Sequence, residues 1–278
     1  MEILNPGNVV PFYANIKSKM RYRAGCREFN WAIPVEQGKS PGMQFPVDAA
    51  PLGTYTMALL DENEDFVASP TSDYLLYSED AEGNAWITIM PNIAFLTSLD
   101  CGIYSLKISA DRSTTVAYSE DFRITNMTNK ERAYRFEFYN DTDVDGIIYQ
   151  GNYKQQFWLL NAIFDTPEIV EPSEAITNGD AVEVVVFQSV QRRDVLRFPN
   201  LPDFWQGVFN RLRMIGHFSI TKLETGESWD LVGREFTVSS EEQDYCFRKG
   251  MFSWIASTQV MGGCEENKVM VMLNNSTP

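Results

Sequence analysis

The sequence predicts a mainly β protein with two β-sandwich-like domains, the second of which carries one packed α-helix, preceded by an irregular N-terminal arm. Three patterns predict this class. Apolar residues alternate with polar ones at a period of two in most segments, and turn-forming residues recur about every 8–12 residues. A helical period of apolar residues occurs in one segment only. A chain of 278 residues is long enough for two such domains.

Residues 1–45 are predicted to form the arm. Proline and glycine interrupt every potential element in this segment. It is also the one basic segment of an acidic protein, through Lys17, Lys19, Arg21, Arg23 and Arg27. Its apolar residues are too numerous for a solvated tail, so we expect the arm to dock. Docking on its own domain is favoured, and docking on a neighbouring subunit stays open.

The first domain is predicted over residues 46–126, with strands in residues 53–60, 74–78 and 85–90 and a turn over residues 61–65. Residues 100–124 then form a hairpin around the turn Asp111–Ser113. One face of its first strand holds Tyr104, Leu106 and Ile108, and one parity of its second strand holds Val116, Tyr118, Phe122 and Ile124. Glu120 falls on this apolar parity, which predicts a β-bulge or a sheet edge there.

The second domain is predicted over residues 127–278, because the polar segment Thr125–Glu131 lacks apolar periodicity and marks a boundary. Its strands are expected in residues 134–139, 147–149, 157–160, 181–187, 252–259 and 268–273. Residues 218–221 are expected to pair with residues 236–238 in a hairpin that reverses at Thr225–Gly226. Residues 167–179 are expected to be a long acidic loop.

The helix is predicted near residues 203–215. Its apolar stripe consists of Phe204, Trp205, Val208, Phe209, Leu212 and Ile215. Asn200 or Asp203 can cap its N-terminus, and Gly216 can end it. The stripe predicts that this helix packs on the sheet of the second domain.

The composition excludes several functions. A net charge of −15 argues against a general nucleic-acid binder, because the chain has no broadly basic surface to displace counterions from phosphates. We expect no secretory signal, and no apolar run approaches the ~20 residues that span a bilayer. The four cysteines are scattered without a C-x-x-C pair. We interpret them as reduced thiols of a protein made in a cytoplasm.

No residue pattern predicts catalysis or cofactor binding. His217 is the single histidine, and it follows the predicted helix, where a capping or surface role is favoured over a catalytic one. The sequence contains no phosphate-binding loop and no dinucleotide fingerprint. Trp158, Trp205, Trp229 and Trp254 could stack on a sugar, but core positions are favoured. We therefore assign no catalytic, cofactor-binding or metal-binding residues and expect no enzymatic activity.

The sharpest local pattern is Asp141, Asp143, Asp145 and Gly146, which reproduces the start of an EF-hand calcium loop. Position 12 of such a loop would be Asn152, which cannot supply a bidentate carboxylate. The flanking residues also have the pattern of strands. A solvated turn between two strands is therefore favoured, and calcium binding stays the alternative.

Two regions resemble a known family. Cys101–Ile108 (CGIYSLKI) and Tyr118–Ile124 (YSEDFRI) resemble a hairpin that recurs in virion proteins of tailed phages and prophages of Bacteroidetes, including crAss-like phages. Residues 136–145, 148–149 and 157–160 resemble the region that follows this hairpin in the same proteins. The resemblance implies a tail-associated structural protein without catalysis, built of β-sandwich-like domains.

The expected function is therefore that of a non-enzymatic virion component, such as a ring, collar, hub or baseplate protein of the tail, made in the host cytoplasm. Its expected partners are copies of itself in a homo-oligomeric ring and neighbouring tail or portal-side proteins. We expect no sequence-specific binding of nucleic acid and no membrane insertion. The alternative is a carbohydrate- or receptor-binding module of a phage or bacterial surface, with or without calcium, and a cryptic hydrolase ranks last.

Overall fold

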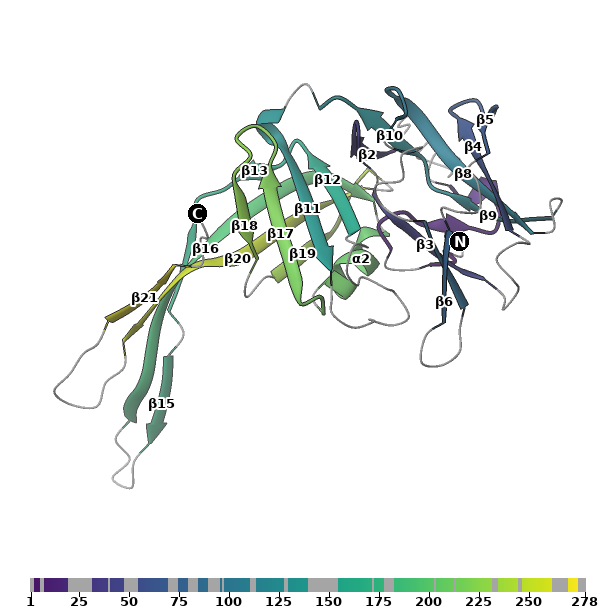
Figure 1. Ribbon diagram of the computed structural model, residues 1–278. Coiled ribbons are helices and arrows are strands. Elements are labelled where there is room, and N and C mark those ends of the chain that lie inside the picture. The colour runs from purple at the N-terminus through teal and green to yellow at the C-terminus, as the bar shows by residue number, and fades with distance from the viewer. Residues whose placement is uncertain are drawn as a thin grey trace.

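The chain folds into a mainly β structure, shown as a computed structural model in Figure 1. The structure describes residues 3–5, 8–19, 32–39, 41–47, 55–69, 75–79, 85–89, 96, 98–110, 114–127, 130–139, 155–171, 173–177, 183–202, 204–212, 214–231, 235–244, 247–261 and 270–274. The predicted class, mainly β with a packed helix in the C-terminal half, is confirmed.

The described N-terminal half contains two sheets. In the larger one, β5 (Phe66–Ala68) pairs with β4 (Tyr55–Asp61), and β4 pairs with one edge of β8 (Gly102–Ala110). The other edge of β8 pairs with both β9 (Thr114–Ser119) and β10 (Phe122–Thr125). The sheet ends with β1 (Phe12–Tyr13), which pairs with β9, and β2 (Ile33–Glu36), which pairs with β10. The smaller sheet has the order β3 (Met43–Val47), β7 (Ala85–Ile89), β6 (Leu75–Glu79). The rings of Phe12 and Phe45, one from each sheet, are 4.9 Å apart. The two sheets therefore share a core.

The predicted hairpin is present, and it contains the predicted bulge. Tyr118 pairs with Lys107 and Phe122 pairs with Tyr104. The segment from Tyr118 to Phe122 therefore advances four residues where β8 advances three. The extra residue lies at Glu120, between β9 and β10. Because a bulge reverses the facing of the residues before it, Ala117 is buried and Tyr118 is only half-buried. The expectation that Tyr118 shares the core face with Phe122 is therefore wrong.

The N-terminal arm docks within the chain, as far as residues 3–5, 8–19, 32–39 and 41–45 describe it. The expectation that proline and glycine interrupt every element of the arm is wrong, because β2 and most of β3 lie in it. Val9 and Val10 are buried, and β1 pairs with β9 in an antiparallel arrangement. The side chain of Asn5 donates a hydrogen bond to the carbonyl of Val10 at 2.9 Å and accepts one from the backbone N–H of Phe12 at 2.6 Å. The Asn5 side chain thus holds the arm segment together, and the pairing of β1 with β9 docks it on the N-terminal half of its own chain, which agrees with the favoured prediction.

The described C-terminal half contains two further sheets. The first has the order β12 (Gln155–Leu160), β11 (Ala133–Tyr139), β17 (His217–Lys222), β18 (Ser228–Asp230). The second is built on the long pair β16 (Glu183–Pro202) and β20 (Phe247–Met261). Three short strands pair with β16: β13 (Ile163–Phe164), β14 (Glu168–Val170) and β15 (Ser173–Thr177). Two strands pair with β20: β19 (Glu235–Asp244) and β21 (Met270–Asn274). These two sheets form a sandwich around an aromatic core.

Aromatic rings connect the two C-terminal sheets. Phe136 of β11 stacks on Phe157 of β12 with ring centroids 4.5 Å apart. It also contacts Phe252 of β20, in the facing sheet, at 5.0 Å. Phe218 of β17 stacks on the same Phe252 at 5.7 Å. Clusters of this kind stabilise a core beyond the area that they bury.

The helix α2 (Trp205–Leu212) lies within the predicted range and is shorter than it at both ends. All six residues of the predicted stripe are buried, from Phe204 to Ile215. Asn200 belongs to β16 and does not cap the helix, and Gly216 lies four residues beyond its end. In the described residues, no helix is long and apolar enough to cross a membrane.

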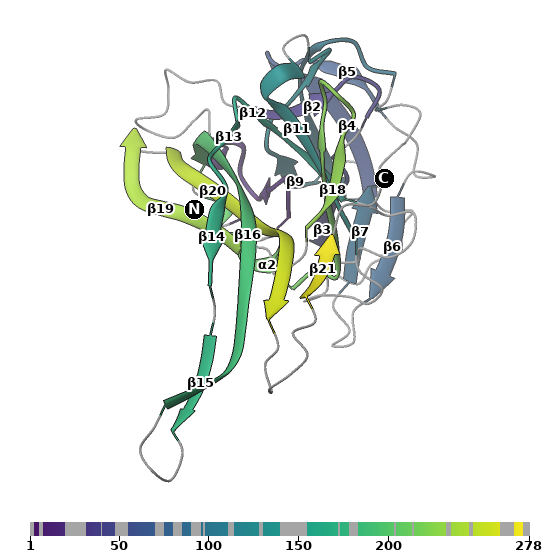
Figure 2. The same ribbon diagram turned by 90° about the vertical axis from the view of Figure 1, so that its left-hand side faces the viewer.

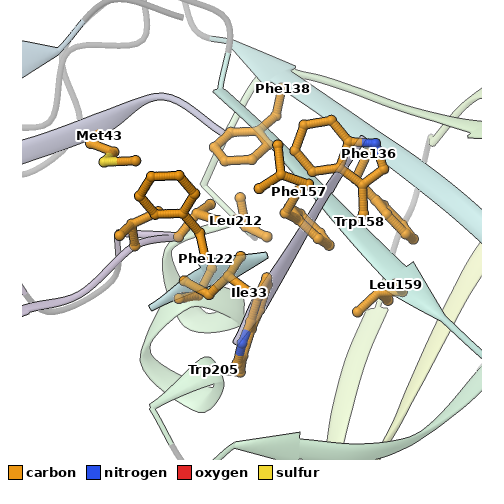
Figure 3. Packing of buried hydrophobic residues seen from close by; sticks show 14 of the residues in the cluster. Ile33, Met43, Phe122, Phe136, Phe138, Phe157, Trp158, Leu159, Trp205 and Leu212 are labelled. Carbon is orange, nitrogen blue, oxygen red and sulfur yellow. The ribbon is translucent and has the colours of Figure 1, made fainter. Parts of the chain in front are cut away.

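One buried cluster runs through both halves of the chain. Figure 3 shows Ile33, Met43 and Phe122 of the N-terminal half beside Phe138 and Trp205 of the C-terminal half. Polar contacts cross the same junction. The N–H of Gln156 bonds the carbonyl of Pro41 at 3.2 Å, and Arg135 lies 3.4 Å from Glu36. The division into residues 46–126 and 127–278 stays a prediction, and the two parts are packed together.

Two expectations for the second domain are wrong. The acidic segment 167–179 contains the strands β14 and β15, both paired with β16. Strand β17 pairs with the short strand β18 after the predicted reversal at Gly226, whereas β19 joins the other sheet. In both places, backbone pairing with a neighbouring strand outweighs the local pattern.

Candidate functional site

A ribbon of strands extends from the C-terminal half beyond the body of the molecule (Figures 1 and 2). It consists of β15, the first residues of β16, the last residues of β20, and β21. Strand β16 alone has 20 residues and is therefore about 65 Å long. Its buried apolar residues Val195, Leu196 and Phe198 lie in its second half. Figures 1 and 2 show the first residues of β16 reaching away from the body.

The strand β14 lies where the ribbon joins the body, and Figure 2 shows it beside β16. All three of its residues are exposed, including Ile169 and Val170. Among the described strands, β14 pairs with β16 on one side only. An edge strand with exposed apolar residues is a surface to which another chain can bind.

A second exposed surface is the acidic tip, which we define as Asp61, Glu62, Glu64, Asp65, Phe66 and Val67 at the β4–β5 turn. The side chain of Asp61 accepts hydrogen bonds from the N–H groups of Asn63 and Asp65 at 2.8 and 2.9 Å, which fixes the turn. Phe66 is 65% exposed and Val67 is 44% exposed. The turn therefore presents apolar side chains next to four carboxylates.

The electrostatic field near the acidic tip is negative. Asp61 pairs with Tyr104 across β4 and β8. Burial raises the pKa of Tyr104 above its usual value, and the charges of Asp100, Cys101 and Asp61 raise this pKa further. Burial alone raises the pKa of a tyrosine, so the sign of the field follows from the four carboxylates of the tip, and the further rise in the pKa that the neighbouring charges cause agrees with it.

A third surface is the basic corner, which we define as Lys130, Arg132, Leu160, Ile163 and Arg197. It surrounds the tight turn between β12 and β13, where Asn161 has a φ of 60°. Leu160 is 37% exposed and Ile163 is 52% exposed. Arg197 pairs with Ile163 across β16 and β13, and the N–H of Ala162 bonds the carbonyl of Arg132 at 3.2 Å. The corner combines exposed apolar residues with cations.

The charges of the basic corner are only partly balanced by carboxylates. Arg197 forms an ion pair with Asp165 at 2.5 Å. Lys130, Glu131 and Arg132 follow one another in the exposed 3-10 turn η5. With Glu131 and Asp165 included, this surface has three cations and two carboxylates, in a protein whose net charge is −15. It is thus a locally positive surface on an acidic molecule.

A polar pocket of about 340 Å³ opens on the sheet of β11, β17 and β18. Its lining includes Glu137, Tyr139, His217, Ser219 and Asp230. The rings of Tyr139 and His217 stack at 4.2 Å with an interplanar angle of 6°. Glu137 accepts a hydrogen bond from Gln156 at 2.8 Å. The pocket is large enough for a small polar ligand and offers carboxylates, a hydroxyl group and an aromatic face.

The residues singled out in the sequence have different outcomes. His217 is a surface residue, as expected, but it begins β17 and does not cap α2, which ends at Leu212. Asp141, Asp143 and Asp145 lie outside the described residues, so calcium binding there stays a hypothesis. In the described residues, no group of three or more His, Cys, Asp or Glu side chains could hold a metal ion.

Core positions were predicted for four tryptophans, and the structure confirms them for three. Trp158, Trp205 and Trp254 are each 1% exposed. Trp229 is half-buried and packs on Phe164 at 5.6 Å. These indole rings therefore stabilise the sandwich, and the surface aromatic group of the pocket is the Tyr139 ring.

The buried ion pair between Lys19 and Asp121 was not predicted from the sequence. The Nζ atom of Lys19 lies 3.0 Å from the carboxylate of Asp121, and both side chains are nearly inaccessible. Next to it, the hydroxyl of Tyr13 donates a hydrogen bond to the buried carboxylate of Glu120 at 2.9 Å. The placement of Glu120 in the predicted bulge was the one available signal for this cluster. The cluster joins the N-terminal arm to β9 and β10.

Comparison with models of known protein families and with curated protein sequences found no match for this chain.

Proposed function

We propose that this protein is a non-enzymatic structural component of a phage virion, and specifically a tail-associated protein that assembles into a homo-oligomeric ring. It is made in the host cytoplasm, and its partners are copies of itself and neighbouring tail or portal-side proteins. The observation that carries this proposal is the ribbon of β15, β16, β20 and β21, which reaches beyond the body.

The shape of the ribbon supports a role in assembly. A narrow β-ribbon that leaves the core buries little apolar area of its own, and such ribbons are marginally stable in water. Packing against a neighbouring molecule supplies the missing burial. The exposed strand β14 at its base extends the same surface. The ribbon is therefore best explained as a contact element between molecules.

The family resemblance supports the same proposal. The two resembling segments, Cys101–Ile108 and Tyr118–Ile124, lie in β8, β9 and β10 and pair with one another. They therefore belong to one structural unit at the centre of the N-terminal sheet. Because the resembling segments form one unit, the resemblance supports the proposal as an analogy with those virion proteins.

Removal of the pairing capacity of β21 tests the contribution of the ribbon. We expect that replacing residues 270–274 with alternating Gly and Ser raises the concentration at half-assembly at least about tenfold, because part of the interface is lost. The thermal midpoint should change little, since β21 pairs only with Ser257–Met261, whereas the pairing of β16 with β20 continues into the core at Val195 and Leu196. Sedimentation velocity measures both the assembled and the protomeric fraction.

The same replacement at residues 275–278 serves as the control, and it should assemble like the original protein. A β21 variant that assembles at the original concentration would show that the ribbon does not contribute. The location in a virion is tested separately by antibody labelling of purified phage particles. Labelled tails are the expected result, and particles without the protein would exclude the virion role.

The pocket beside His217 supports a second candidate function, the recognition of a carbohydrate or surface receptor. An aromatic ring with adjacent carboxylates and a hydroxyl group provides stacking and hydrogen bonds for a sugar. Binding of the protein to a glycan array, lost on the replacement Tyr139→Ala, would favour this function. An array without any bound glycan would leave assembly as the only candidate.

A further inference from the structure

We propose that the acidic tip of one copy binds the basic corner of the next, so that the ring is built by one repeated head-to-tail contact. This inference rests on the proposed function, since it assigns the contact by which the copies assemble. The occupant of each surface is therefore a second copy of this chain.

Both surfaces combine exposed apolar side chains with charge. Phe66 and Val67 project from the acidic tip, and Leu160 and Ile163 project from the basic corner. These four residues are a majority of the large apolar residues that are exposed in the described part of the chain. Apolar centres surrounded by charged residues are typical of surfaces that bind another protein.

The charges of the two surfaces are opposite in sign. The acidic tip has four carboxylates from Asp61 to Asp65 and no cation. The basic corner has Lys130, Arg132 and Arg197 against Glu131 and Asp165, so it has a net positive charge. Opposite potentials steer association and select the register of an interface.

The signs also select the symmetry. A twofold contact through the acidic tip would bring eight carboxylates together, and a twofold contact through the basic corner would bring six cations together with only four carboxylates. Like charges that face each other oppose association. A contact between the tip and the corner avoids both problems.

The two surfaces lie on different halves of the molecule, as the positions of β5 and β13 in Figure 1 show. Each copy can therefore bind one neighbour through its tip and another through its corner. A contact between two different surfaces is heterologous, and it closes into a ring when the rotation between copies divides a full turn.

The test uses two full-length charge-reversal variants and their mixture. The tip variant is Glu62→Lys with Glu64→Lys and Asp65→Lys, which leaves Asp61 to fix the turn, and the corner variant is Arg132→Glu with Arg197→Glu. Each variant alone has two surfaces of the same sign, so we expect its half-assembly concentration to rise at least about tenfold. In an equimolar mixture the reversed tip of one variant meets the reversed corner of the other, and assembly should return.

The control is Lys17→Glu, which reverses an exposed cation outside the residues that define the two surfaces. It should assemble like the original protein, and all variants should keep their thermal midpoint. The mixture is measured by sedimentation velocity. Recovery of assembly in the mixture alone supports the contact.

Two results would overturn the proposed contact: variants that assemble as the original protein does, or a mixture that stays protomeric. In either case, assembly of the original protein would still support the proposed function, and the copies would be joined by a different contact. An original protein that is protomeric at every concentration would instead remove the ring and the contact together.

Discussion

Replacement of Lys19 with methionine is expected to lower the free energy of unfolding by about 3–5 kcal/mol. The Nζ atom of Lys19 is 3.0 Å from Asp121, and the exposed fractions of the two side chains are 0% and 5%. Methionine has a similar volume and cannot balance the charge, so the carboxylate of Asp121 would remain buried with its cation removed. Urea denaturation followed by tryptophan fluorescence measures the change.

Lys17 provides the matched control, because it is an exposed lysine two residues earlier in the same arm. The replacement Lys17→Met should change the free energy of unfolding by no more than about 0.5 kcal/mol. The double variant Lys19→Met with Asp121→Asn should recover part of the loss, since the buried charge is then removed. Equal stabilities of Lys19→Met and Lys17→Met would contradict the described docking of the arm.

Replacement of Phe136 with alanine is expected to cost about 3–5 kcal/mol, because the ring is fully buried at the centre of the aromatic core. It lies 4.5 Å from Phe157, 5.0 Å from Phe252 and 5.9 Å from Phe218. The substitution removes contacts in both sheets of the sandwich. The replacement Phe66→Ala, at an exposed ring, is the control and should be nearly neutral.

The unfolding curve of the Phe136 variant also tests the junction between the halves. One buried cluster includes residues of both predicted domains, so we expect a single transition that shifts as a whole. Near-ultraviolet circular dichroism and tryptophan fluorescence should report the same midpoint. Two separate transitions, only one of them shifted, would indicate that residues 46–126 and 127–278 fold independently.

Local patterns predicted the features that depend on local chemistry. The alternation of Leu106 and Ile108 gave the core face of β8, and the stripe of Trp205 and Val208 gave the buried face of α2. The polar residue Glu120 on an apolar parity gave the bulge. In each of these cases the side chains and their period decide the structure, without a distant partner.

Features that depend on distant partners could not be predicted. The acidic composition of residues 167–179 indicates a loop, yet Glu168 of β14 pairs with Arg193, well along β16. Likewise, Lys19 was one of several cations in a basic arm, and its burial depends on Asp121, 102 residues away. A single sequence shows the donors and acceptors, whereas their pairing is a property of the fold.

The candidate surfaces were predictable in part. The turn at residues 61–65 was expected from its composition, and the structure confirms it. The exposure of Phe66 and Val67 was not predictable, because apolar residues after a turn usually face the core. The basic corner joins η5, the β12–β13 turn and β16, and three segments so far apart in sequence carry no common pattern.

The mass of the full-length protein in solution tests the central claim, that this molecule acts through contacts between its own copies. Sedimentation velocity from low to high micromolar concentration should show a discrete assembly of several 31.7 kDa protomers. Its population should fall with salt, because screening weakens the attraction between the two charged surfaces. A single species at the protomer mass, at every concentration and salt, would contradict the claim.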